Sequence, residues 1–288
     1  MTSLAVTAAQ NAITMSNVDP SSVKLVLNCC SSSDDAFGDA GKIANLIGCK
    51  DAVAMDLRAA CSGFLFGVVT ASQFLRVGEY CVVVGGDALS KYVDWTDRNS
   101  CILFGDGAGA VVLGGGLAGA DNGVLGYSLH SDGGGHDDLM CESAGSDVVL
   151  PIGPGGSDIT AVKATSPYIT MNGKKVYSFA TREVPAVLKE ALEVSGLGVD
   201  DVDHLLLHQA NSRIMDTVAK RLGIPGKKVI CNLGKYGNTS AGSIPLALDE
   251  AVREGRVKKG DVIACAGFGA GLSWGGAILN WQGPLEVK

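Results

Sequence analysis

The segments VKLVLNCC at residues 23–30 and VDHLLLHQA at residues 202–210 open the same pattern twice in this chain. After the first comes IANLIGCKDAVAMDLRAACSG at 43–63, and after the second comes VAKRLGIPGKKVICNLGKYGNTSAG at 218–242. In both places a short apolar strand is followed by a helix that ends at a glycine, then by a second strand and a turn of small residues. The repetition predicts two related α/β halves.

The two copies stay in step over many residues. The matched positions are Gly48 with Gly223, Leu57 with Leu233, and Cys61-Ser62-Gly63 with Ser240-Ala241-Gly242. We interpret the match as an internal duplication that places a strand-to-helix turn at the same point of each half. Chance similarity between two strand–helix–strand units is the alternative interpretation.

Apolar strands alternate with helical patterns along the chain, which is typical of an α/β protein whose sheets are covered by helices on both faces. We expect an N-terminal half at 1–120 and a C-terminal half at 121–288. The expected strands are 24–27, 53–56, 80–84, 110–113, 204–207, 229–231, 262–266 and 276–280, and the expected helices are 61–77, 175–195, 211–222 and 240–254.

The two halves differ at their beginnings. The strand AGAVVLGG (108–115) precedes the second copy, whereas the first copy begins directly with an amphipathic helix at residue 2. We therefore expect the chain to be one N-terminal strand short of a full duplication.

The composition excludes several classes of protein. The chain has 288 residues, 47% hydrophobic and 18% charged, which is unlike a disordered chain. Its apolar runs are interrupted by glycine, and none reaches the roughly 18 residues that span a bilayer. The net charge of −7 has the wrong sign for a protein that binds nucleic-acid phosphates. The 9 cysteines include no CxxC pair, so we expect a reducing compartment and no metal centre.

Cys61 lies in AACSG, where strand residues give way to a helix that starts near residue 61. A thiol at a helix N-terminus is close to the positive end of the helix dipole and to free N–H groups, which lower its pKa and favour the thiolate. We therefore expect Cys61 to be a nucleophile. A buried structural cysteine is the alternative, and it suits the other cysteines better.

His208 ends the apolar strand HLLLH, and Asn238 lies in YGNTSAG, the turn of the second copy that corresponds to the Cys61 turn. A lone histidine at a strand end, or an asparagine in a glycine-rich turn, is usually structural. Pseudo-symmetric turns tend to meet at the interface between two halves, where pockets form. We therefore expect the Asn238 and Cys61 turns to meet there.

Glycine is abundant, with 40 residues or about twice the usual share. The segment CAGFGAGLSWGG (265–276) looks like a dinucleotide-binding loop, but a strand follows it instead of a helix, and the same holds for LFGDGAGAVVLGG (103–115). Backbone N–H groups in such a turn could instead bind an oxyanion. The loop with His130, His136, Asp137 and Asp138 is better interpreted as a solvated turn than as a metal site.

Residues 211–235 form a basic segment in an acidic chain. Its only acidic residue is Asp216, and its basic residues are Arg213, Lys220, Arg221, Lys227, Lys228 and Lys235. A basic face favours the approach of an acidic partner. An ordinary solvated helix is the alternative.

AACSG around Cys61, LLLHQAN around His208, YGNTSAGSIP around Asn238 and GFGAGLSWG at 267–275 resemble motifs of β-ketoacyl-acyl carrier protein synthase III, the initiating condensing enzyme of type II fatty acid synthesis. The resemblance covers essentially the whole chain, and the second half looks most like plant, algal and cyanobacterial members. It implies a thiolase-like fold, in which two duplicated halves form a layered αβαβα core. It also implies a homodimer without metal or cofactor, located in a bacterial cytoplasm or a plastid stroma.

Carried over residue by residue, the resemblance implies that Cys61 takes the acyl group of an acyl-CoA, with acetyl-CoA the expected primer. The backbone N–H groups of Cys61 and Ala270 would bind the oxyanion. His208 and Asn238 would bind malonyl-acyl carrier protein and stabilise the enolate that forms as CO₂ leaves. The acidic carrier protein would dock on the basic segment 211–235.

The resemblance also implies further substrate-binding residues, which are Phe37, Arg98, Phe104, Asn211, Arg213, Phe268 and Gly269. Of these, Phe37 would reach into the acyl pocket of the partner in the dimer, and Arg213 would meet the carrier protein or the CoA phosphates. Family members carry a further N-terminal segment with the first strand and with a Trp and an Arg that clamp the CoA adenine. This chain begins after that segment.

Three other functions are compatible with part of the pattern. A related condensing enzyme of polyketide or quinolone synthesis would share the three residues. A cysteine peptidase would share the order Cys, His, Asn, but the C-G-[SA]-C-[WY] signature is absent. A non-catalytic partner subunit would be expected to lack the nucleophile, which is present.

Overall fold

The computed structural model describes residues 1–98, 100–116, 123–142, 145–150, 153–164 and 168–285. The helices are α1 (Thr2–Ser16), α2 (Ala40–Leu46), α3 (Gly63–Phe74), α4 (Gly173–Ser195), α5 (Ser212–Leu222), α6 (Leu233–Tyr236) and α7 (Ser243–Arg253). The strands are β1 (Val23–Cys29), β2 (Val53–Leu57), β3 (Tyr80–Ala88), β4 (Asp106–Gly114), β5 (Val124–Ser131), β6 (Leu139–Met140), β7 (Gly145–Leu150), β8 (Ile159–Ala164), β9 (Thr170–Met171), β10 (His204–Leu207), β11 (Val229–Ile230), β12 (Val262–Gly269) and β13 (Ser273–Asn280). None of these helices is both long and apolar enough to cross a bilayer.

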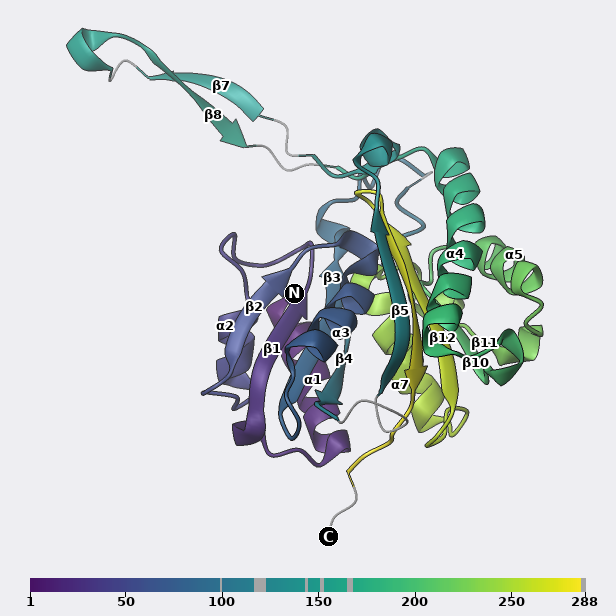
Figure 1. The fold of residues 1–288 in the computed structure, drawn as a ribbon. Coiled ribbons are helices and arrows are strands. Elements are labelled where there is room, and N and C mark those ends of the chain that lie inside the picture. The colour runs from purple at the N-terminus through teal and green to yellow at the C-terminus, as the bar shows by residue number, and fades with distance from the viewer. Residues whose placement is uncertain (99, 117–122, 143–144, 151–152, 165–167, 286–288) are drawn as a thin grey trace.

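Two sheets with the same topology form the centre of the molecule (Figure 1). One has the strand order β2-β1-β3-β4, and the other has the order β11-β10-β12-β13-β5. In each sheet the first three strands run parallel and the next one is antiparallel. The shared order agrees with the duplication inferred from the sequence.

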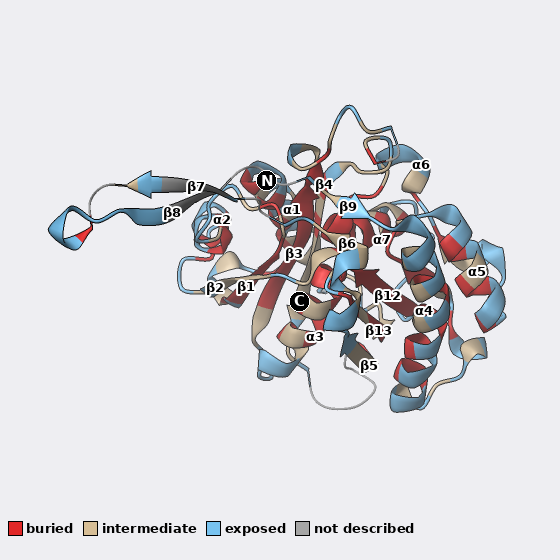
Figure 2. Ribbon diagram, turned by 90° about the horizontal axis from the view of Figure 1, so that it is seen from above, coloured by how far each residue is buried: buried red, intermediate tan, exposed pale blue. Residues whose placement is uncertain are grey.

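The strands bury both faces, because successive side chains point to opposite sides of a sheet. Leu25 and Leu27 of β1 pack with α3 and α7 in a cluster between the two sheets, whereas Val26 packs with α1 and α2 outside. In the second sheet Leu206 belongs to the middle cluster and Leu205 packs with α4 and α5. The layers are therefore αβαβα, as expected, and Figure 2 shows the buried strands under more exposed helices.

The strand that distinguishes the halves is not the one expected. AGAVVLGG, except its last glycine, lies in β4, which pairs with β3 and completes the first sheet. The extra strand of the second sheet is β5, which pairs antiparallel with β13 and was not predicted. Among the described residues no strand pairs with the other edge of β4, and a cavity of about 430 Å³ runs along residues 110–116. The expected boundary at 120/121 lies outside the described residues.

The described residues between β5 and α4 form small additions to the core. β6 pairs with β9, and β7 pairs with β8 in a hairpin that extends away from the body (Figure 1). The period-2 and period-3.6 patterns of the sequence did not indicate these strands. The reason is that none of them contributes to a continuous core.

The repeated turns have the same unusual backbone. Of the described non-glycine residues, Asn17, Ala60 and Ser240 have positive φ, and the last two, with φ of 45° and 51°, open the short turns before α3 and α7. Such values are uncommon for residues with a Cβ. The backbone therefore pairs Ala60 with Ser240, so Cys61 corresponds to Ala241. The sequence match was wrong by one residue, because it aligned small side chains and not the strained position.

Candidate active site

The two repeated turns meet between the halves. A Cβ built on Gly63, at the start of α3, would lie 3.5 Å from the Cβ of Ala241. A cavity of about 770 Å³ opens beside them, and its lining includes Cys61, His208 and Asn238. Three residues far apart in the sequence thus face one space.

Cys61 follows β2 and lies in the short turn before α3. Burial raises the pKa of its thiol to about 12, while a hydrogen bond from the Ser240 hydroxyl, with Oγ 3.4 Å from Sγ, opposes the rise. We expected a lowered pKa, and that expectation was wrong. The helix N-terminus is present, but removal of the thiolate from water outweighs it. Cys61 is therefore a protonated thiol in the free site at neutral pH.

His208 follows β10, and its backbone N–H donates to the Ala266 carbonyl at 2.8 Å. The ring packs edge-on against Phe268, with 5.1 Å between centroids. Burial lowers the pKa of His208 to about 3, so the imidazole is neutral. A neutral imidazole has one N–H to donate and one nitrogen to accept. The ring can therefore donate a hydrogen bond to a substrate carbonyl without carrying a charge.

Asn238 is held by both its backbone and its side chain. Its N–H donates to the Leu103 carbonyl and its carbonyl accepts from Gly105, both at 2.9 Å. Its side-chain Oδ1 accepts the Ser240 N–H at 2.9 Å. Because the amide oxygen is occupied, the amide group presents Nδ2, a donor, to a ligand.

The turn after β12 lies against the nucleophile. A Cβ built on Gly269 would be 2.8 Å from the Cys61 Cβ and 2.9 Å from the Cys61 nitrogen. Only glycine allows this approach. Gly269 and the next residue, Ala270, both line the cavity. Part of the glycine excess is therefore explained by close packing between the halves.

The remaining predicted residues divide into two groups. Phe104, Asn211, Phe268, Gly269 and Ala270 line the same cavity as the three central residues. Phe37, Arg98 and Arg213 are exposed and lie outside that lining. Phe37 is fully exposed, at 101%.

Sequence reasoning missed three residues near the site. Ser240 bonds to the sulfur of Cys61, Asp87 is buried behind it, and Arg58 lines the cavity. The signal for Asp87 was a carboxylate at the end of the apolar run YCVVVGGD. Ser240 could have been found from its place in the repeated turn, had the two copies been matched by backbone shape.

The basic segment 211–235 is partly used inside the fold. Arg221 donates to the Thr181 carbonyl, Lys228 donates to the Val202 carbonyl, and Lys235 pairs with Glu250 at 3.1 Å. The cations of this segment that remain exposed, with neither an ion pair nor a side-chain hydrogen bond in the described part of the chain, are Arg213, Lys220 and Lys227. The patch available to a partner is therefore smaller than the sequence suggested.

The loop with His130 and His136 to Asp138 has other partners. His130 lies 2.7 Å from Glu190 and stacks on Trp274, and Asp138 pairs with Lys175 at 2.8 Å. No cluster of metal-ligating side chains was found in the ranges that the structure describes.

Two family models match the chain, both described as 3-oxoacyl-(acyl-carrier-protein) synthase III. One matches residues 55–133, which contain Cys61, and the C-terminal model matches 192–281, which contain His208 and Asn238. The chain belongs to the synthase III family. The fold and the membership that the motifs implied are thereby confirmed.

Sequence and structural similarity to individual proteins supports this assignment. A β-ketoacyl-(acyl-carrier-protein) synthase III of Acaryochloris marina is 54% identical over 96% of this chain and 81% of its own length. The crystal structure of 3-oxoacyl-(acyl carrier protein) synthase III from Pseudomonas aeruginosa has a TM-score of 0.85 and 34% identity, over 99% of this chain and 84% of that one. The priming β-ketosynthase of the R1128 polyketide pathway has a TM-score of 0.83 and 32% identity, over 98% and 81%. The chain is 54% identical to the Acaryochloris marina protein and 32% identical to the polyketide ketosynthase. The comparisons therefore do not favour the polyketide alternative.

Proposed function

We propose that this synthase III condenses an acyl-CoA primer, acetyl-CoA in the first place, with malonyl-acyl carrier protein. The products are 3-oxoacyl-acyl carrier protein, CoA and CO₂, and the reaction is the first condensation of type II fatty acid synthesis. The observation that carries this proposal is the common cavity of a buried thiol, a neutral imidazole and an oriented amide.

In the first half-reaction the Cys61 sulfur attacks the thioester carbonyl of the primer. The new S–C bond forms as the bond to the CoA sulfur breaks, and the CoA thiolate takes up the proton that the Cys61 thiol gives up. The backbone N–H groups of Cys61 and Ala270 would hold the negative oxygen of the intermediate. Because the pKa of Cys61 is raised, the thiol keeps its proton until the substrate excludes water and places the carbonyl.

In the second half-reaction the carboxylate of the malonyl group leaves as CO₂. Its bonding electrons pass to an enolate, whose oxygen would accept hydrogen bonds from the ring N–H of His208 and from Nδ2 of Asn238. The enolate carbon then attacks the acyl group on Cys61, the bond from that acyl carbon to the Cys61 sulfur breaks, and the released thiolate takes up a proton from solvent. A neutral His208 suits this role, because its N–H is far less acidic than that of an imidazolium and donates a hydrogen bond without protonating the enolate.

Mass spectrometry after incubation with acetyl-CoA tests the proposal. We expect an added acetyl mass on the Cys61 peptide, its loss in Cys61→Ala, and its retention in Cys231→Ala, which removes an exposed thiol outside the cavity. His208→Ala and Asn238→Ala should still be acylated but should release CO₂ from malonyl-acyl carrier protein at least tenfold more slowly. An unmodified Cys61, or normal CO₂ release by both variants, contradicts the proposal.

The proposal extends to partners and location. The exposed cations Arg213, Lys220 and Lys227 are the surface on which we place the acidic carrier protein. A second copy of the chain would receive the exposed Phe37 in its acyl pocket. We place the enzyme in a bacterial cytoplasm or a plastid stroma. We also propose that its two halves are residues 1–120 and 121–288.

A further inference from the structure

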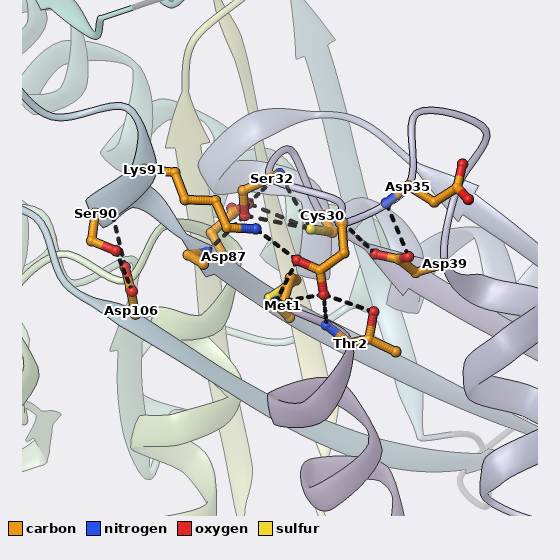
Figure 3. A network of polar contacts seen from close by, with 12 residues as sticks. Met1, Thr2, Cys30, Ser32, Asp35, Asp39, Asp87, Ser90, Lys91 and Asp106 are labelled. Carbon is orange, nitrogen blue, oxygen red and sulfur yellow. Dashed lines mark hydrogen bonds and ion pairs between the residues drawn. The ribbon is translucent and has the colours of Figure 1, made fainter. Parts of the chain in front are cut away.

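Asp87 is a fully buried carboxylate that the proposed reaction does not use. It lies near the end of β3, and one of its oxygens is bound by the turn that follows β1. That oxygen, Oδ1, accepts from the Ser31 N–H at 2.8 Å, the Ser32 N–H at 3.0 Å and the Ser32 hydroxyl at 2.8 Å, as Figure 3 shows in part. These bonds satisfy Oδ1 entirely within the first half of the molecule.

The other oxygen of Asp87 faces the second half. Oδ2 accepts the Ala241 N–H at 3.4 Å. Burial raises the pKa of Asp87, and the nearby Ser240 hydroxyl opposes that rise. Ser240 and Ala241 form the strained turn beside the nucleophile. One side chain thus joins the two halves at the site.

Ser240 connects this carboxylate to two proposed catalytic residues. Its N–H holds Oδ1 of Asn238, and its hydroxyl oxygen lies 3.4 Å from the Cys61 sulfur. The Ser240 hydroxyl donates its single proton to that sulfur. This bond favours the negative charge that the sulfur develops as it attacks.

The backbone of Ser240 needs such an anchor. Its φ of 51° is costly for a residue with a Cβ and persists only where the surroundings hold it. The hydrogen bond from the Ala241 N–H to Asp87 holds the residue that follows Ser240, and so fixes the turn. Without this bond the turn can relax, and the Ser240 hydroxyl and the amide of Asn238 would move from the reacting atoms.

We propose that Asp87 is a positioning residue of the condensation, which fixes the Ser240–Ala241 turn and through it sets the hydrogen bonds on Cys61 and Asn238. The proposal rests on the proposed function. Ser240 touches the reacting sulfur, whereas Asp87 acts only through Ser240 and Ala241.

Asp87→Asn tests the contact to Ala241 apart from the contacts to Ser31 and Ser32. The single oxygen of the amide can still accept the hydrogen bonds from Ser31 and Ser32. The amide NH₂ group then faces the Ala241 N–H, and because both are donors, no hydrogen bond forms between them. We expect folded Asp87→Asn to lose at least about tenfold in kcat for acylation and for malonyl decarboxylation, with KM for acetyl-CoA within twofold of wild type. Ser240→Ala keeps its N–H, so it should lose about tenfold or more in acylation only.

Two matched controls report on structure alone. Ser32→Ala removes a hydrogen bond from the first-half side of Asp87, and Ser243→Ala removes a buried hydroxyl that bonds to Thr239 at 3.3 Å. Both should keep kcat for the two half-reactions within twofold of wild type, even where they lower Tm. Circular dichroism and Tm establish that each variant is folded.

The outcomes separate the two proposals. Folded Asp87→Asn with both rates within twofold of wild type overturns the role of Asp87. If Asp87→Asn does not fold, normal acylation by Ser240→Ala overturns it instead. A wild-type enzyme that forms no Cys61 adduct overturns the proposed function first.

Discussion

At the scale of single residues, the space around Cys61 is set by Gly269. A methyl group at this position would meet the Cys61 Cβ at 2.8 Å and its nitrogen at 2.9 Å, closer than side chains pack. We expect Gly269→Ala to displace the thiol and to lower the acylation rate by about a hundredfold, since a shift of roughly 1 Å has that effect. The free energy of unfolding should fall by about 1–3 kcal/mol. Rapid-quench acylation and urea unfolding measure the two effects.

Gly226→Ala is the matched control for this substitution. Gly226 has no atom within 4 Å of its built Cβ. Gly226→Ala should therefore leave both the acylation rate and the free energy of unfolding close to those of the wild type. Wild-type acylation by folded Gly269→Ala would show that the close contact does not position Cys61.

The sequence indicated the chemistry of these residues better than their surroundings. Cys61, His208 and Asn238 could be selected because each carries a reactive or polar group at a strand end or turn. The raised pKa of Cys61 could not be predicted, because it depends on burial by segments distant in sequence. Ser240 and Asp87 were missed for the same reason, since their importance lies in contacts between the halves.

At the scale of elements, Asn211 has a structural role that the resemblance did not suggest. It is the N-cap of α5, and its Oδ1 accepts the Arg213 N–H at 2.9 Å. Asn211→Ala should lose about 1 kcal/mol of stability, within the usual 0.5–2 kcal/mol of a lost cap, whereas Asn211→Asp should keep the cap. Urea unfolding of both variants measures this difference.

The same pair tests whether Asn211 also binds substrate. If its amide contacts CoA, both variants should bind acetyl-CoA more weakly, whatever their stability. If the affinity of Asn211→Asp equals that of the wild type, the substrate contact assigned to the amide is wrong and capping is its role.

Elements with a strong apolar period were predicted well, and those without one were not. β10 and α5 lie within about one residue of their expected ranges, because each buries an apolar face. β5 was missed although it lies in the second sheet, since its sequence VLGYSLHS mixes glycine and polar residues with the apolar ones. The β7–β8 hairpin lies outside the core, so burial left no pattern in its sequence.

At the scale of the whole molecule, charge is distributed unevenly over an acidic protein. The net charge of the chain is −7. Two exposed cations nevertheless lie near the cavity, because Lys220 is on α5 and Lys227 follows it. The N-cap of α5 is Asn211, which lines the cavity. Exposed charges affect association more than stability, because solvent and salt screen them. Their effect should therefore appear in the encounter with an acidic carrier protein.

The double variant Lys220→Glu, Lys227→Glu tests this docking surface. We expect kcat/KM for malonyl-acyl carrier protein to fall about tenfold or more at low salt, because attraction becomes repulsion. Raising the salt from about 50 to 500 mM should slow the wild type but not the variant, since screening shortens the range of the field to a few ångströms. Lys24→Glu, Lys42→Glu makes the same change in net charge on exposed positions of β1 and α2 and should stay within threefold of wild type. If the control loses as much as the test variant, net charge and not this surface governs the encounter, and the docking site lies elsewhere.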